Sequence, residues 1–177
     1  MKSKIISVSA ISAGFVAIFL LIGAYFEIAD IFTITISSVF VTLPLYFNSY
    51  KGSFLSFLAG GLIAFICSGF NLISLVFPAY FAYFGIYPII KCVLKDKIKN
   101  SFIRFLVGLI WFVIVAFLLY YYYTLFMGAT FDGLPNFIIK YVEIFIVLIS
   151  VVFFVVYDKF LTVTRKVADY YLRKIVK

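Results

Sequence analysis

The stretch FIRFLVGLIWFVIVAFLLYYYYTLF, residues 102–126, contains one charged residue, Arg104, and decides the fold class. About 20 consecutive apolar residues are enough to cross a lipid bilayer as a helix. The whole chain of 177 residues has the same character, with 66% apolar and 12% charged residues. Soluble domains average about 45–50% apolar and about 25% charged residues. We therefore exclude a water-soluble domain and expect an all-α integral membrane protein.

Apolar runs on both sides of this stretch predict a transmembrane domain of six helices over residues 1–157. The second run alternates Ser and Thr with apolar residues and would also suit a strand, but a lone strand cannot span lipid. Pro78 and Pro88 in the fourth run predict kinks. The expected spans are about 5–25, 31–47, 53–68, 72–90, 102–126 and 135–157.

The positive charges predict the orientation of these spans. Six spans place both termini on one side, and that side then holds 14 of the 15 Lys and Arg residues. Because cytoplasmic loops are enriched in Lys and Arg, we expect a multi-pass protein of the cell membrane with both termini in the cytoplasm. The positive charge thus reflects topology and does not indicate a nucleic-acid partner. Cys67 should lie near the outer end of the third span and Cys92 at the inner end of the fourth span. Because a bilayer thickness then separates them, we expect no disulfide between them.

Residues 158–177 are polar and amphipathic, with a basic face on one side of the expected helix and an apolar face on the other. This pattern predicts a basic cytoplasmic helix on the inner leaflet. The alternative is a plain continuation of the sixth span into the cytosol.

Catalytic motifs are missing from the sequence. The chain has no histidine, which removes the commonest metal ligand and the commonest general base near neutral pH. It also contains no P-loop, zinc-protease, nucleophile-elbow or CxxC motif. We therefore expect no enzyme, no cofactor and no metal site.

Lys140 and Glu143 are the strongest candidates for a ligand site. They are three residues apart, hence on one helix face, at roughly 8 and 12 Å below the outer start of the sixth span. Ionisable residues at such depth usually face the bundle interior and indicate function. Asn136 lies one turn from Lys140 on the same face. The alternative is a structural ion pair with Lys140 extended outward.

Two further residue sets each allow a functional and a structural interpretation. Tyr80, Tyr83 and Tyr87 share a face of the fourth span and would line a pocket for a flat ligand, or they are ordinary packing in a chain with 14 Tyr and 24 Phe. The second set recurs every fourth residue on the first span and forms a small-residue face that lets another helix approach closely. That helix would belong either to a partner or to this chain's own bundle. The face consists of Ser9, Ala13 and Ala17.

The six spans, the paired termini and the Ala13 and Ala17 spacing AxxxA resemble the S component of energy-coupling factor transporters. The stretches FPAYFAYFGIYPIIKCVLKDK (77–97) and FFVVYDKFLTVTRKVADYY (153–171) also resemble Firmicute membrane proteins of this organisation. The resemblance implies a subunit that binds a micronutrient and passes it to a transmembrane coupling subunit with ATPase subunits. It implies that Lys140 and Glu143 contact a small-molecule ligand, that Asn136 and the tyrosines shape its pocket, and that Ala13 and Ala17 meet the coupling subunit.

A non-transporting membrane scaffold of the cell envelope is the alternative function. It predicts no ligand. The Ser9, Ala13 and Ala17 face would then bind a structural partner, and Lys140 with Glu143 would form an internal pair.

Overall fold

The computed structural model describes residues 2–71, 73–127 and 141–175, and within these ranges every regular element is helical. The elements are α1 (Lys2–Tyr25), the 3-10 helix η1 (Glu27–Ala29), α2 (Asp30–Val41), the 3-10 helix η2 (Leu43–Phe47), α3 (Tyr50–Cys67), α4 (Val76–Ala79), the π-helical segment η3 (Tyr80–Phe84), α5 (Tyr87–Lys97), α6 (Ser101–Met127) and α8 (Val142–Ile175).

Six helical stretches are long and apolar enough to cross a membrane, which confirms the predicted all-α class and the six helices of spanning length. Two of the predicted runs correspond to more than one element, because α2 continues into η2 and the proline-bearing run comprises α4, η3 and α5. The stretches are Ser3–Tyr25, Asp30–Phe47, Tyr50–Cys67, Val76–Lys97, Ser101–Leu125 and Val142–Ala168.

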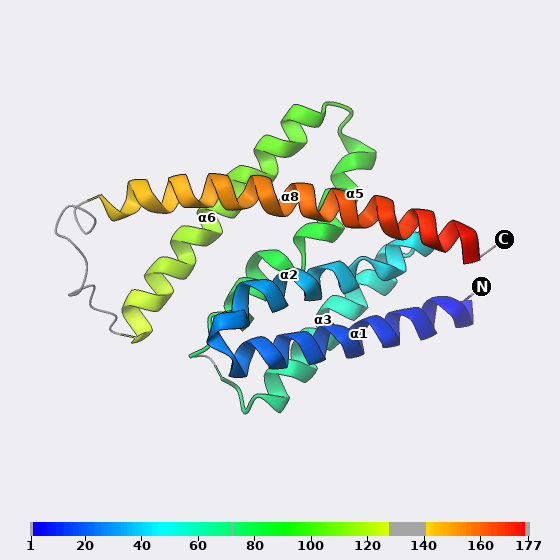
Figure 1. Ribbon diagram of the computed structural model, residues 1–177, viewed down its shortest axis with the longest axis horizontal. Helices are drawn as coiled ribbons and strands as arrows, with labels where there is room; N and C mark the ends of the chain where they lie inside the picture. The colour runs from blue at the N-terminus through cyan, green and yellow to red at the C-terminus, as the bar shows by residue number, and fades with distance from the viewer. Residues whose placement is uncertain (1, 72, 128–140, 176–177) are drawn as a thin grey trace.

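Helices α1, α2 and α3 form a closely packed group at one side of the molecule (Figure 1). Small residues permit the approach: a Cβ on Gly60 would lie 2.6 Å from Val16 Cγ1 and 2.8 Å from the Ala13 carbonyl oxygen. Serine hydroxyls then join the backbones, since Ser56 donates to the Ser9 carbonyl oxygen at 2.9 Å and Ser12 to that of Phe40. In lipid, which is as apolar as the helix surfaces, burial of apolar side chains does not drive helices together. Close backbone contact and hydrogen bonds from hydroxyl groups stabilise their association instead.

The proline-bearing segment α4–η3–α5 forms the centre of the fold. Its helix changes from α to π geometry at Tyr80–Phe84, where the Gly85 amide bonds to the Tyr80 carbonyl, and restarts with Pro88 in the first turn of α5. Pro88 fits that position because its missing N–H would have had no partner there. In an 18-residue stretch of the span Val76–Lys97, 61% of the residues are buried, a larger share than in the corresponding stretch of any other described span.

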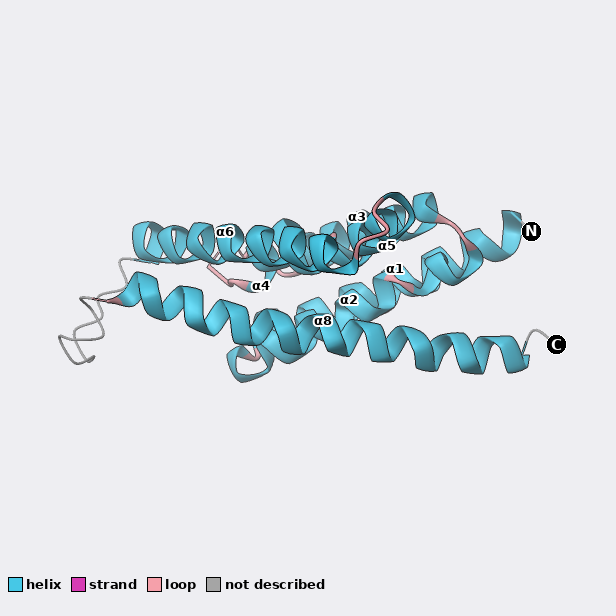
Figure 2. Cartoon of the chain, turned by 90° about the horizontal axis from the view of Figure 1, so that it is seen from above, coloured by secondary structure: helices cyan, strands magenta, loops and turns pink. Residues whose placement is uncertain are grey.

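The α6 and α8 helices cross on the outside of this centre. They overlap in Figure 1 and lie at different depths in Figure 2, and the start of α1 and the end of α8 lie at the same end of the molecule in both views. Helix α8 continues without a break through residue 175. Residues 158–175 are therefore helical and continuous with the predicted sixth span, and the position of this segment on the inner leaflet stays a prediction.

Candidate functional site

The site predicted on the sixth span is described only in part. Lys140 and Asn136 lie outside the described residues. Glu143 is in the first turn of α8, and its side chain is exposed. The Lys140 and Glu143 site therefore stays a prediction.

Tyr80 and Tyr83 lie in the core of the molecule, and both are fully buried. The Tyr80 hydroxyl donates to the Phe57 carbonyl oxygen at 3.1 Å, and the Tyr83 ring stacks on that of Tyr87 with centroids 4.8 Å apart. The ring of Tyr83 also meets Trp111 edge-on. Such contacts fit the alternative in which the tyrosines are ordinary packing residues. Neither tyrosine lines the two pockets described below.

The small-residue face of the first span is covered by the chain itself. Ala13 and Ala17 are buried, and α3 lies against this face through the Ser56 bond to Ser9 and the close approach of Gly60. Packing within the bundle is thus the alternative that the contacts support. A partner helix that used Ala13 and Ala17 would first have to displace α3.

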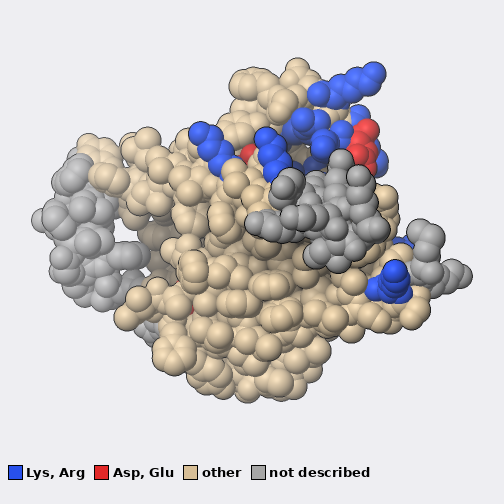
Figure 3. All heavy atoms as spheres, turned by 45° about the vertical axis from the view of Figure 1, so that its right-hand side comes forward, with Lys and Arg blue, Asp and Glu red and all other residues tan. Residues whose placement is uncertain are grey.

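A pocket of about 340 Å³ lies between α5, the first turns of α6 and the C-terminal half of α8, and we call it the basic pocket. The pocket lies near the end of the molecule where Lys and Arg side chains gather. Most of the remaining surface in the same view is uncharged (Figure 3). The charged side chains that line it are Lys91, Lys95, Arg104, Asp158, Arg165 and Lys166.

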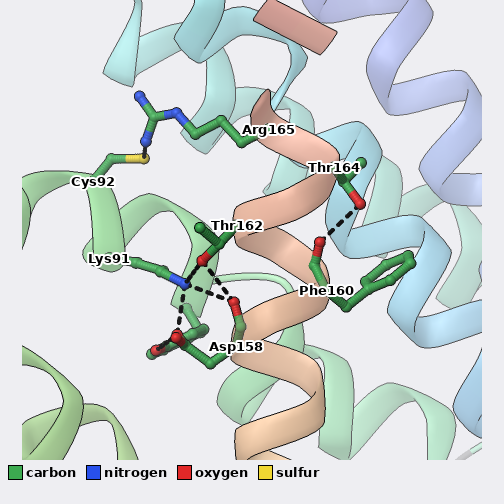
Figure 4. Close-up of polar contacts among 8 residues, drawn as sticks. Lys91, Cys92, Asp158, Phe160, Thr162, Thr164 and Arg165 are labelled. Atoms are coloured by element: carbon green, nitrogen blue, oxygen red, sulfur yellow. Dashed lines mark hydrogen bonds and ion pairs between the residues drawn. The ribbon is translucent and has the colours of Figure 1, made fainter. Parts of the chain in front are cut away.

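A hydrogen-bonded clamp joins α5 to α8 at the wall of the basic pocket (Figure 4). Lys91 Nζ lies 2.6 Å from Asp158 Oδ1 and donates to Thr162 Oγ1 at 2.8 Å. Tyr87 donates its hydroxyl to the same Asp158 Oδ1 at 2.6 Å. Residues four apart share a helix face, so Tyr87 with Lys91 on α5 meets Asp158 with Thr162 on α8. Asp158, the carboxylate that lines the basic pocket, is therefore already bonded to Lys91 and Tyr87.

Among the residues that the structure describes, Lys91 forms an ion pair with Asp158. The other four cations of the basic pocket have no carboxylate partner there. Arg104 donates one guanidinium N–H to the Ile98 carbonyl oxygen at 2.8 Å, and Arg165 contacts Cys92 Sγ. A guanidinium has five N–H donors, so both arginines keep donors for a ligand. The four cations are Lys95, Arg104, Arg165 and Lys166.

Sequence reasoning used these cations to orient the chain and to predict a basic helix over residues 158–177, and it named Tyr87 as a candidate pocket residue. It did not predict the pocket between α5, α6 and α8. One signal was available: Tyr87, Lys91 and Lys95 repeat every fourth residue, so one face of α5 carries the hydroxyl and both ammonium groups. The partner face on α8 could not be assigned, because the sequence does not show which helices lie side by side.

A second hollow of about 400 Å³ lies between α2 and α8, and no charged side chain lines it. Its walls are apolar apart from the hydroxyls of Thr35 and Tyr157. The charge and the converging donors are thus concentrated in the basic pocket.

Comparisons of the chain with protein-family models, with curated proteins and with solved structures give no match. The geometry and charge of the basic pocket are therefore the features that indicate a function.

Proposed function

We propose that this chain is a membrane-embedded binding protein for an anionic ligand, which it holds in the basic pocket. The observation that carries the proposal is the convergence of four cations from three helices on one pocket whose single carboxylate is already engaged by Lys91 and Tyr87. Like charges held together repel one another, and an anion between them removes that repulsion and accepts their hydrogen bonds.

The helices rather than the side chains alone bring these cations together. Arg104 is in the first turn of α6, Lys95 is near the end of α5, and Arg165 and Lys166 are on α8. The clamp between Lys91 and Asp158 keeps α8 beside α5 and so positions both sets of donors. Donors fixed before binding lose less conformational freedom when the ligand arrives.

This proposal keeps one part of the function that the resemblance implies, a binding subunit within the membrane, and places the ligand at the basic end of the bundle. The enrichment of cytoplasmic loops in Lys and Arg predicts that this end faces the cytoplasm. Uptake of a micronutrient energised by a separate ATPase module is a further hypothesis, and it is compatible with anion binding. The alternative of a non-transporting scaffold in the cell envelope predicts no ligand.

Two matched pairs of lysine substitutions test the proposal. Lys95 and Lys166 line the basic pocket, whereas Lys97 and Lys159 are exposed, lie on the same two helices and do not line it. The variants Lys95→Gln/Lys166→Gln and Lys97→Gln/Lys159→Gln therefore remove the same charge from the same helices. We would measure pyrophosphate binding by calorimetry at constant ionic strength in an uncharged detergent.

We expect the pocket pair to weaken pyrophosphate binding about tenfold, the effect of losing roughly 1.4 kcal/mol of charge-assisted hydrogen bonding. The control pair should change the affinity by less than about twofold, because screened charges outside the pocket contribute little. Equal losses in both pairs, or no binding by the unmodified chain, would overturn the proposal.

A further inference from the structure

The basic pocket lies where the apolar spans end. One span ends at Lys97 and the next begins at Ser101, and the pocket is lined by residues from the adjoining turns of both helices. The α8 residues that line it, up to Lys166, are in the last turns of the span Val142–Ala168. This is the level at which lipid phosphate groups meet transmembrane helices, and basic pockets between such helices bind anionic headgroups.

The walls and surroundings of the basic pocket are apolar as well as charged. Pro88, Leu94, Phe105 and Leu161 line it beside the cations. The two helices that supply its arginines also present apolar side chains outward, as Phe102 on α6 is 66% exposed and Val163 on α8 is 58% exposed. A ligand that combines an anionic group with apolar chains would match both surfaces.

The size of the basic pocket limits how much of such a ligand it can enclose. Its volume of about 340 Å³ is near the lower end of the roughly 300–1,000 Å³ that ligand pockets occupy. A diacyl lipid is too large to be enclosed there, whereas its phosphate and glycerol groups are small. The acyl chains would then lie outside, along the exposed faces of α6 and α8.

We infer that the ligand of the basic pocket is an anionic phospholipid, with its phosphate among Lys95, Arg104, Arg165 and Lys166 and its acyl chains on the outer faces of α6 and α8. The inference rests on the anion-binding function proposed above. The excess of positive charge in the pocket repels a choline headgroup, so the site selects against zwitterionic lipids. A free organic phosphate offers the same anionic chemistry without the chains.

Three probes separate these sources of the anionic group: dioctanoyl phosphatidic acid, dioctanoyl phosphatidylcholine and glycerol 3-phosphate. Binding of each to the full chain in uncharged detergent would be measured by native mass spectrometry for the lipids and by calorimetry for glycerol 3-phosphate. The variants are Lys95→Gln/Lys166→Gln with its control Lys97→Gln/Lys159→Gln, and Phe102→Ser with its control Phe54→Ser. Phe54 is 45% exposed on α3 and lines neither pocket.

We expect phosphatidic acid to bind at least about tenfold more tightly than phosphatidylcholine, with the preference lost in the pocket lysine pair and kept in its control. Phe102→Ser should weaken phosphatidic acid about threefold and leave glycerol 3-phosphate unchanged, while Phe54→Ser should change neither. If Phe102→Ser leaves phosphatidic acid binding intact while glycerol 3-phosphate binds through the lysines, the lipid inference fails and anion binding stands. If no probe depends on the pocket lysines, both proposals fail.

Discussion

The α1–α3 group and the α6–α8 pair hold together by different means. In α1–α3, glycine and serine bring backbones into contact, and 39% of the α3 span is buried. In an 18-residue stretch of each of α6 and α8, only 17% and 22% of the residues are buried. Large rings supply much of their packing, for example Phe112 of α6 stacked on Phe153 of α8 with centroids 5.8 Å apart.

The difference shows where the molecule can respond to a ligand. Lipid chains are as apolar as the helices, so helix association depends on close backbone packing or on polar links. The α1–α3 group spreads its stability over a long interface, whereas α8 is joined to α5 by the clamp of Tyr87, Lys91, Asp158 and Thr162. The clamp borders the basic pocket, so a bound anion would act directly on the link that positions α8.

The largest effect is expected from Gly60→Ala, which tests the dependence of α1–α3 on backbone contact. The added Cβ would lie 2.7 Å from Val16 Cβ and 2.8 Å from the Ala13 carbonyl oxygen, so the two helices must separate. We expect a loss of about 2 kcal/mol in the free energy of unfolding, in the range for overpacked sites. Denaturant titration in detergent, followed by helical circular dichroism, measures it.

Gly14→Ala is the matched control on the exposed face of α1, where a Cβ would meet nothing within 4 Å. Alanine also favours the helix over glycine by about 1 kcal/mol, so this variant should be neutral or slightly stabilising. Similar losses in Gly14→Ala and Gly60→Ala would show that the close approach of α1 and α3 contributes nothing to stability.

Much of the fold follows from the sequence because lipid imposes strict rules on it. The 25 residues of FIRFLVGLIWFVIVAFLLYYYYTLF predict a helix long and apolar enough to cross a membrane, and α6 over Ser101–Met127 confirms the helix. The prolines predicted irregularity in the fourth span, and the structure has a π-helical segment there. The sequence could not show that Ala13 packs against α3, because a small-residue face has the same pattern whichever helix covers it.

The candidate site was less predictable for a physical reason. A pocket between three helices depends on their relative rotation and depth, which local periodicity does not encode. Asp158 is one residue past the expected end of the sixth span, so it was assigned to the tail. Its contact with Lys91, distant in sequence, appears only when α5 and α8 are side by side.

A smaller effect is expected from Asp158→Asn, which weakens the clamp while keeping the shape of the side chain. The variant loses the ion pair with Lys91 and weakens the Tyr87 bond. Both charged side chains are partly exposed, at 29% and 21%, so we expect a cost of about 1.5 kcal/mol. Amide hydrogen exchange should speed up about tenfold in the C-terminal half of α8 and stay unchanged in α1–α3.

Asp96→Asn is the control for this clamp variant. Asp96 is exposed on α5 and accepts a bond from Tyr50, so its loss should cost less than about 0.5 kcal/mol and leave exchange in α8 unchanged. Uniform acceleration across all helices in Asp158→Asn would mean that the two regions unfold together and that the clamp does not govern α8 separately.

The smallest effects are expected from removing the hydroxyls of two tyrosines in the shared core. The Tyr80 hydroxyl bonds to the Phe57 carbonyl oxygen of α3, so Tyr80→Phe should cost about 1 kcal/mol. The Tyr83 hydroxyl is buried and makes no hydrogen bond of normal geometry among the described residues, although it interacts with the Tyr87 hydroxyl, so Tyr83→Phe should leave stability unchanged or raise it slightly. Denaturant titration of both variants measures the difference. A loss as large in Tyr83→Phe as in Tyr80→Phe would mean that Tyr83 has a polar partner, such as a water molecule, beside the rings of α6 and α8.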